Sequence, residues 1–256
     1  MDYKAKANEA RKEVLRMIHK ASTSHIASNF SVIDIATVLY ENLKEGDEVV
    51  WSKGWAAATI YYFLEKQGKI TKEQRDSFPN PPFLGLAETS VNGVLVNGGS
   101  VGHGLSVACG IAYSKKLLGD KGNVYCIMSD GELNEGSVWE AVMFASHHKL
   151  DNLVAIIDKN GWQAMGKTSD VIKIDARYAF SGFSWNMFEI DGHNYAQLGE
   201  VMNYKSIANL DNSQPVVIVA NTIKGKGVSF FEDHLLYHYK HVDVDDFNKA
   251  MKELNA

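Results

Sequence analysis

Apolar residues recur along the chain with two different periods, and these periods alternate from one end to the other. Short continuous apolar runs predict buried strands, and repeats every three to four residues predict amphipathic helices. The predicted strands are 48–51, 124–128, 153–157, 185–190 and 215–221. The predicted helices are 3–21, 32–43, 55–66, 106–118, 134–149, 195–210 and 242–254, with a short helix capped by Thr71. This alternation predicts one doubly wound α/β domain over residues 1–256, in which helices cover both faces of a mostly parallel sheet in three layers.

The segment 124–163 carries the clearest functional signal in the sequence. Two predicted strands flank a helix there, and they end at Asp130 and at Asn160. Parallel strands present their carboxyl ends at one edge of a sheet, which is where ligands bind in open α/β folds. We therefore expect the two side chains to lie close together. Their oxygens suit Mg²⁺, which prefers a few protein oxygens completed by phosphate and water.

Three further loops are expected to reach the same edge. His25 lies in a polar turn before the helix predicted at 32–43, for which Ser31 is the expected N-cap. Such a histidine either faces a ligand or is an ordinary loop residue. Four glycines within 97–105 either allow a close approach to a ligand or serve helix packing. Lys224, after the last predicted strand, either faces phosphate or stays solvated.

The composition indicates the class of protein but gives little information about its chemistry. The formal net charge of −5 and the ordinary content of 45% hydrophobic and 22% charged residues favour neither nucleic acid nor an anionic membrane as a partner. The cysteines, Cys109 and Cys126, lie in apolar surroundings, so a reducing compartment is expected and a disulfide framework is not. The N-terminus lacks a signal-peptide core, and no apolar run approaches the roughly 20 residues that span a bilayer. We expect a cytoplasmic protein.

The residues from Asp130 to Asn160 resemble the thiamine diphosphate signature, which begins GDG and ends with an asparagine one strand later. Four segments resemble the transketolase family in particular. They are GSVGHGLS at 99–106, DGELNEGSVWEA at 130–141, HKLDNL at 148–153 and TIKGKGVSF at 222–230. The resemblance covers only the diphosphate-binding part of a transketolase. It therefore implies the N-terminal subunit of a split transketolase, with the parallel α/β fold of that domain.

The resemblance implies a thiamine diphosphate cofactor held through Mg²⁺. Asp130 and Asn160 would bind the metal through their side chains, and Trp162 through its backbone carbonyl. The residues expected beside the cofactor are Gly99, Val101, Gly131, Glu135, Asn160 and His238.

The implied reaction transfers a two-carbon ketol unit from a ketose donor to an aldehyde acceptor. His25, His238 and His103 are the expected catalytic residues, which would orient sugar hydroxyls and help to move protons. The substrates would be sugars or sugar phosphates. A partner subunit that carries the pyrimidine-binding domain would supply the glutamate that activates the cofactor, in an α₂β₂ assembly.

Several departures from the family pattern alter the expected chemistry. Trp55 stands where the family segment SKGHAA has histidine, and an indole cannot shuttle protons as an imidazole does. The turn around His25 lacks the family glycines, and Ser129 replaces the first glycine of GDG. We infer an altered donor or acceptor in a specialised sugar pathway. Two alternatives stay open. One is another thiamine diphosphate-dependent carboligase or decarboxylase, such as a 1-deoxyxylulose-5-phosphate synthase-like enzyme, and the other is a catalytically silent regulatory subunit.

Overall fold

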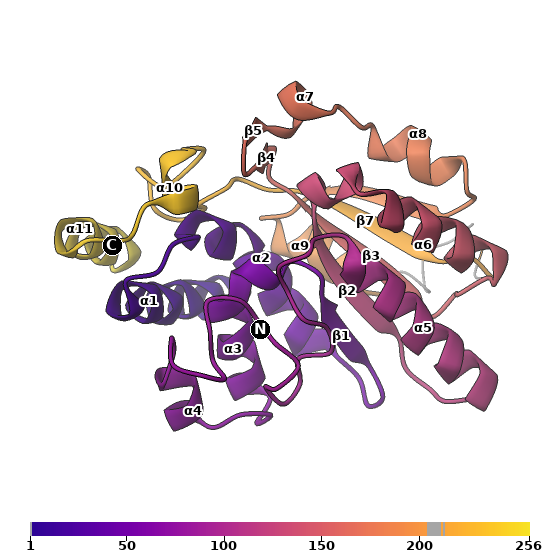
Figure 1. Cartoon of the computed structure of the whole chain (residues 1–256), viewed down its shortest axis with the longest axis horizontal. Helices are drawn as coiled ribbons and strands as arrows, with labels where there is room; N and C mark the ends of the chain where they lie inside the picture. The colour runs from indigo at the N-terminus through magenta and orange to yellow at the C-terminus, as the bar shows by residue number, and fades with distance from the viewer. Residues whose placement is uncertain (1, 204–210, 212) are drawn as a thin grey trace.

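A computed structural model describes residues 2–203, 211 and 213–256. Within them, parallel strands form a five-stranded sheet in the order β1-β2-β3-β7-β6 (Figure 1). These strands are β1 Glu48–Trp51, β2 Val124–Ser129, β3 Leu153–Lys159, β7 Val216–Asn221 and β6 Asn186–Asp191. A separate antiparallel pair consists of β4 Trp162–Gln163 and β5 Gly166–Lys167.

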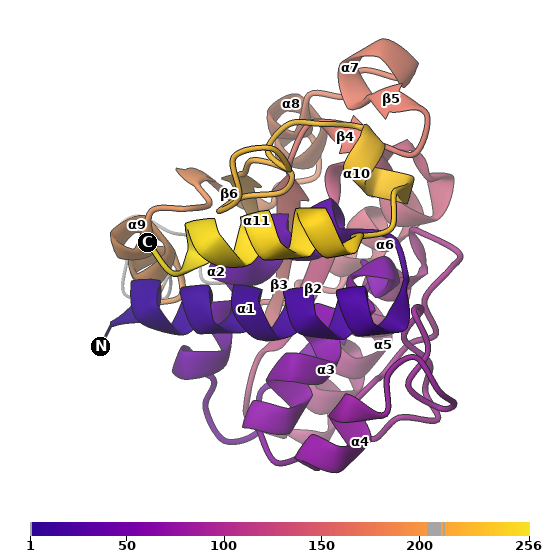
Figure 2. The same cartoon turned by 90° about the vertical axis from the view of Figure 1, so that its left-hand side faces the viewer.

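Helices cover both faces of the sheet (Figure 1). One face packs against α1 Tyr3–Ala21, α2 Ile26–Asn42, α3 Ala57–Lys66, α9 Tyr195–Val201 and α11 Val244–Leu254. The opposite face packs against α5 His103–Leu118, α6 Gly136–His147 and α8 Ala176–Ser181. Short helices occupy the connections: η1 Gly54–Ala56, α4 Lys72–Asp76, η2 Asp130–Asn134, α7 Thr168–Val171 and α10 Leu236–Tyr239. Figure 2 shows α11 lying along α1, so the two ends of the chain share one layer. The predicted three-layer, doubly wound fold is confirmed.

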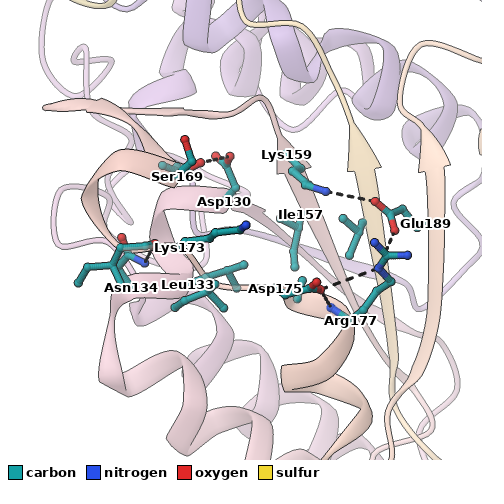
Figure 3. A pocket seen from close by; sticks show the side chains of 15 residues that line it. Asp130, Leu133, Asn134, Ile157, Lys159, Ser169, Lys173, Asp175, Arg177 and Glu189 are labelled. Atoms are coloured by element: carbon teal, nitrogen blue, oxygen red, sulfur yellow. Dashed lines mark hydrogen bonds and ion pairs between the residues drawn. The ribbon is translucent and has the colours of Figure 1, made fainter.

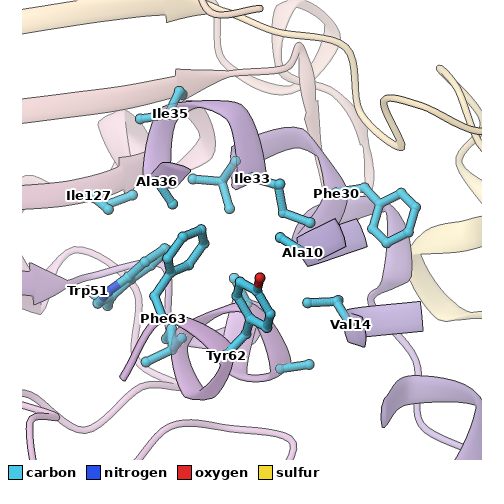
Figure 4. Close-up of a cluster of buried hydrophobic side chains, with 14 of the residues drawn as sticks. Ala10, Val14, Phe30, Ile33, Ile35, Ala36, Trp51, Tyr62, Phe63 and Ile127 are labelled. Carbon is cyan, nitrogen blue, oxygen red and sulfur yellow. The ribbon is translucent and has the colours of Figure 1, made fainter. Parts of the chain in front are cut away.

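The side chains of each strand alternate between two hydrophobic cores, because successive residues of a strand point to opposite faces. On β2, Tyr125 and Ile127 belong to the core beneath α1, α2 and α3, whereas Cys126 and Met128 belong to the core beneath α5 and α6. Figure 4 shows part of the larger core, where Ile127 lies close to side chains of α2 and α3. Burial on both faces explains why these strands read as continuous apolar runs. None of the described helices is long and apolar enough to cross a membrane.

The start of α2 was predicted wrongly. The helix was expected to begin at residue 32 after an N-cap at Ser31, but it begins at Ile26, with His25 as its N-cap. Ser31 is fully buried inside the helix, and its hydroxyl donates to Asp158 Oδ2 at 2.6 Å. Ser31 is thus a buried partner of β3 and not a helix cap, which periodicity alone does not reveal.

Other boundaries also differ from the prediction. The helix expected at 134–149 runs from Gly136 to His147, because η2 forms a separate turn closed by a capping box between Ser129 and Glu132. The helix expected from 106 begins at His103, and the one expected at 55–66 starts with η1.

The remaining differences lie in the C-terminal half. The helix expected at 195–210 is present as Tyr195–Val201, and residues 204–210 of that prediction lie outside the described residues. The strands expected from 185 and 215 begin at Asn186 and Val216, and the last helix begins at Val244 behind the N-cap Asp243.

Candidate active site

A cavity of about 330 Å³ lies at the carboxyl edge of the sheet. The segments that follow β1, β2, β3 and β7 line it, together with the first residues of α2 and with α10. The predicted site residues in its lining are His25, Val101, Gly131, Glu135, Asn160, Trp162 and His238. Among the described residues, three predicted site residues lie outside this lining: Gly99, His103 and Asp130, the last of which lines a neighbouring cavity. The strand ends thus bring together most of the residues that the sequence singled out.

Asp130 and Asn160 meet where β2 and β3 end. Asp130 Oδ2 accepts a hydrogen bond from the Gly161 N–H at 2.8 Å, and Asn160 Oδ1 accepts one from the Trp162 N–H at 3.1 Å. Burial, reinforced by the nearby charge of Asp158, raises the pKa of Asp130 to about 6. A cation beside this carboxylate would therefore relieve an unfavourable charge.

The donor set at this point suits Mg²⁺. The described residues contain no cluster of three or more His, Cys, Asp or Glu side chains that could hold a metal. The expected ligands are instead one carboxylate, one amide oxygen and one backbone carbonyl, all hard oxygens of the kind that Mg²⁺ accepts when phosphate completes its shell. These residues fit the metal that the sequence predicts.

A buried ion pair beside the cavity orients Asn160. Asp158 is fully buried and accepts from Lys53 Nζ, from the Ser31 hydroxyl and from the Thr222 hydroxyl. Asn160 Nδ2 also donates to Asp158 Oδ2, at 3.3 Å. Because the amide nitrogen faces Asp158, the amide oxygen faces the other way. Asp158 thus decides which end of the Asn160 amide a metal would meet.

Two neutral histidines lie against each other in the cavity wall. The rings of His25 and His238 lie edge to face, with centroids 4.9 Å apart. Burial, with a further contribution from Lys224, lowers the pKa of His25 to about 4 and that of His238 to about 3. His238 Nδ1 lies 2.6 Å from Lys224 Nζ. An ammonium group has only donors, so Nδ1 accepts and Nε2 carries the ring proton of His238.

Lys224 is the cation most deeply placed in the cavity wall. It is 1% exposed, and burial, with a contribution from Lys53, lowers its pKa to about 8. The ammonium form still dominates at pH 7. The sequence left open whether this lysine is solvated; it is buried and lines the cavity.

Aromatic side chains form the outer wall of the cavity. Trp55 stacks on His25 with ring centroids 4.6 Å apart and planes inclined by 17°. The Tyr239 hydroxyl donates to the Ala164 carbonyl at 2.5 Å, which ties α10 to the β4–β5 hairpin. Trp162 Nε1 donates to Asp233 Oδ1 at 2.5 Å. The residue that replaces the family histidine is thus in direct contact with a predicted catalytic residue.

Glu132 was not identified from the sequence, although it connects three loops of the site. It is fully buried and accepts from the Gly102 N–H at 2.9 Å, from the Ser129 N–H at 2.8 Å and from the Ser52 hydroxyl. A glutamate three residues after Ser129 matches the spacing of a capping box, and this signal could have revealed part of its role.

The glycine loop owes part of its composition to close packing against the protein itself. A Cβ at Gly104 would lie 2.3 Å from the Cβ of Ser52, and one at Gly54 would lie 2.4 Å from the Cα of Gly98. This is one of the two interpretations that the sequence left open. His103 begins α5, and its Nε2 lies 3.3 Å from the Ser100 hydroxyl.

A second cavity, of about 220 Å³, lies on the other side of Asp130, between β3 and the segment that contains α7 and α8 (Figure 3). Four of its charged side chains pair with one another. Lys159 and Arg177 both contact Glu189, and Arg177 also lies 3.9 Å from Asp175. Of the predicted site residues only Asp130 lines it, so the first cavity is the candidate active site.

Comparisons with known proteins identify the family of this chain. The family model "Transketolase, thiamine diphosphate binding domain" matches residues 3–255. A subunit of the apulose-4-phosphate transketolase of Phocaeicola vulgatus is 32% identical, over 96% of this chain and 91% of that protein. The 6-deoxy-6-sulfo-D-fructose transketolase subunit SqwG of Clostridium sp. is 31% identical, over 99% of this chain and 96% of that protein.

Solved structures of longer transketolases share the fold. The transketolase of Campylobacter jejuni superposes with a TM-score of 0.90 at 25% identity, over 100% of this chain and 43% of that chain. The transketolase of Leishmania mexicana gives a TM-score of 0.91 at 22% identity, over 100% and 41%. This chain therefore spans about two fifths of those proteins. It belongs to the transketolase family, and it matches the thiamine diphosphate binding domain of that family over nearly its whole length.

Proposed function

We propose that this chain is the diphosphate-binding subunit of a split transketolase, which transfers a two-carbon ketol unit from a ketose to an aldehyde. The observation that carries the proposal is the meeting of Asp130 and Asn160 beside a cavity lined by two neutral histidines and a buried lysine. Bound thiamine diphosphate would supply the nucleophilic carbon and the electron sink for cleaving and forming carbon–carbon bonds.

Mg²⁺ is the proposed means of balancing the charge of the diphosphate. The charged residues that line the cavity are two lysines, Lys53 and Lys224, and two glutamates, Glu132 and Glu135, so their formal charges of +2 and −2 cancel. A buried diphosphate brings further negative charge that must be paired. Mg²⁺ held by Asp130, Asn160 and the Trp162 carbonyl would pair it, with Lys224 facing the phosphate oxygens and Gly131 beside them.

The neutral imidazoles are suited to handling sugar hydroxyls. His238 carries its proton on Nε2 because Nδ1 accepts from Lys224, so it can donate one hydrogen bond. His25 is held by Ser24, whose hydroxyl lies 2.7 Å from Nδ1. Each ring can exchange a proton with a hydroxyl without first losing a charge. The proposed roles of Gly99 and His103 rest on the family resemblance alone, because neither lines the cavity.

The names of two relatives support a partner chain and a class of substrate. Two relatives that match over most of their length are named as subunits, which supports a partner chain. We propose that this partner carries the pyrimidine-binding domain, that the assembly is α₂β₂, and that it works in the cytoplasm. The same relatives are named for apulose-4-phosphate and for 6-deoxy-6-sulfo-D-fructose, which supports a specialised sugar or sugar phosphate as substrate.

Calorimetry tests the cofactor site. Thiamine diphosphate is titrated, with and without Mg²⁺, into this chain mixed with the partner that co-purifies with it. We expect Mg²⁺-dependent binding, and we expect Asp130→Ala and Asn160→Ala each to weaken it by at least about tenfold, because each removes a metal ligand. Asp120→Ala is the matched control, since Asp120 lies just before β2, at the opposite edge of the sheet.

A donor–acceptor screen with the same complex then tests the reaction. Transfer of a ketol unit between sugars supports the transketolase proposal. Release of carbon dioxide from a 2-oxo acid would point to the decarboxylase alternative instead. Failure of the complex to bind the cofactor, with Asp130→Ala indistinguishable from the natural chain, would leave the alternative in which the chain is catalytically silent.

A further inference from the structure

A buried polar network is centred on Asp34 of α2. It lies outside the lining of the candidate active-site cavity. Asp34 accepts hydrogen bonds from Arg11 Nη2 at 2.6 Å, from His193 Nδ1 at 2.7 Å and from the Tyr195 hydroxyl at 2.7 Å. The side chains of Asp34, Arg11 and His193 are 3%, 7% and 12% exposed. Although burial opposes ionisation, the bond from His193 and the charge of Arg11 hold the pKa of Asp34 below its usual range. Asp34 is therefore a carboxylate that only accepts.

The carboxylate fixes the tautomer of His193. Because Asp34 accepts from Nδ1, that nitrogen carries the proton and Nε2 is free to accept. The Ile223 N–H donates to Nε2 at 2.8 Å. Both ring nitrogens are thus engaged, one by helix α2 and the other by the segment that follows β7. Few side chains other than an uncharged imidazole offer a donor and an acceptor in this opposed arrangement.

The segment that His193 contacts is the Lys224 loop, residues 222–227. Arg11 Nε donates to the Lys226 carbonyl at 2.8 Å, so the network holds the loop at a second point. Between these two anchors Lys224 enters the cavity wall and contacts His238 Nδ1. The Gly225 N–H donates to the carbonyl of Ala27, close to His25. A shift of the loop would therefore move a lysine and a histidine of the site together.

We propose that His193, oriented by Asp34, is a positioning residue that anchors the Lys224 loop and thereby sets Lys224 and His238 against the cavity. The inference rests on the proposed function in one respect, namely that the group facing Lys224 is the diphosphate of the cofactor. The anchoring itself concerns only residues of this chain. Loss of the acceptor would leave the Ile223 N–H without its partner, and the loop would open more often.

Two substitutions at His193 separate its two bonds. In His193→Asn the amide can still donate to Asp34, but the side chain is too short to accept from Ile223. In His193→Gln the longer side chain places an amide oxygen where Nε2 was, so the bond from the Ile223 N–H is kept. Trp185→Phe is the matched control, because it breaks a buried hydrogen bond to the Val142 carbonyl in the other core.

Hydrogen–deuterium exchange on the full chain measures directly how often the Lys224 loop opens. In His193→Asn we expect exchange in residues 222–227 to rise by about tenfold or more, which is the effect of losing one buried hydrogen bond. His193→Gln should stay near the natural rate, and Trp185→Phe should leave this loop unchanged. Equal rates in His193→Asn and the natural chain would overturn the proposal, as would an equal rise in the two His193 variants and Trp185→Phe.

Cofactor affinity provides the second readout, measured by calorimetry on the complex with Mg²⁺. We expect the Kd of thiamine diphosphate to rise by about tenfold in His193→Asn and to recover in His193→Gln. If the natural complex does not bind the cofactor but the exchange pattern holds, the proposed function fails and the anchoring role is supported. If the complex binds the cofactor and His193→Asn alters neither exchange nor affinity, the positioning role fails and the proposed function stands.

Discussion

Lys53→Met should destabilise the fold strongly, because it breaks an ion pair with little access to water. Lys53 is 6% exposed and Asp158 is fully buried. Methionine keeps most of the length of the side chain but leaves the carboxylate with only hydroxyl and amide partners. Breaking one side of a buried pair costs about 3–5 kcal/mol. With an m-value of about 3 kcal/mol per molar, the urea midpoint should fall by about 1–1.7 M.

Lys159→Met is the matched control for this experiment. Lys159 follows Asp158 at the end of β3, is 45% exposed, and pairs with Glu189 at 3.1 Å. Surface pairs of this kind contribute about 0–1 kcal/mol, so its midpoint should move little. Unfolding is followed by tryptophan fluorescence and by circular dichroism. Equal midpoint shifts in Lys53→Met and Lys159→Met would refute the reasoning.

The pH dependence of the stability of Lys53→Met tests whether loss of the ion pair with Asp158 causes the destabilisation. Burial opposes ionisation of Asp158, but the charge of Lys53 lowers its pKa below the usual value. The stability that it contributes is therefore present above the unfolded pKa of about 3.9 and is lost as the pH falls through the lower folded value. In Lys53→Met burial is opposed only by hydrogen bonds from uncharged neighbours such as Ser31 and Thr222, so that pKa rises. The loss in free energy of unfolding, relative to the natural chain, should be full at pH 7 and should shrink towards pH 5. A loss that grows on acidification would contradict this account.

Three other results are expected. Because burial lowers the pKa of Lys224 to about 8, thiamine diphosphate affinity measured by calorimetry should fall as the pH rises through 8, and Lys224→Met should abolish that dependence. Trp55→Ala should uncover His25 and raise its pKa from about 4 towards 6.5, as measured by NMR titration; an unchanged value would exclude Trp55 as a cause of its burial. Cys109 and Cys126 are buried with raised pKa values, so a thiol reagent should label them only after unfolding.

The strands and the edge where they end could be predicted because both depend on local signals. Four of the five strands of the described sheet, β1, β2, β3 and β7, are short and mostly apolar. Parallel pairing then places Asp130 and Asn160 at one edge without further information. The order of the strands was not predicted, since it depends on which helices pack together and not on any single segment.

Buried polar partners could not be predicted, because their partners come from distant parts of the chain. Ser31 and Lys53 both contact Asp158, which lies more than a hundred residues further along. In the sequence Ser31 is indistinguishable from a helix cap. The helix α2 that contains it is buried on most sides, so it lacks the polar face that marks the boundaries of a surface helix.

The sequence and the contacts of Trp55 indicate different consequences of this departure from the family pattern. In the sequence it is the loss of an imidazole, which suggests weakened proton transfer. In the structure it stacks on His25 and remains 39% exposed, so it covers an imidazole that is still present. Burial keeps His25 neutral, and a neutral ring can bind a hydroxyl and accept its proton. Trp55 therefore places a large aromatic ring in the cavity wall beside His25, and we expect its main consequence in the choice of substrate.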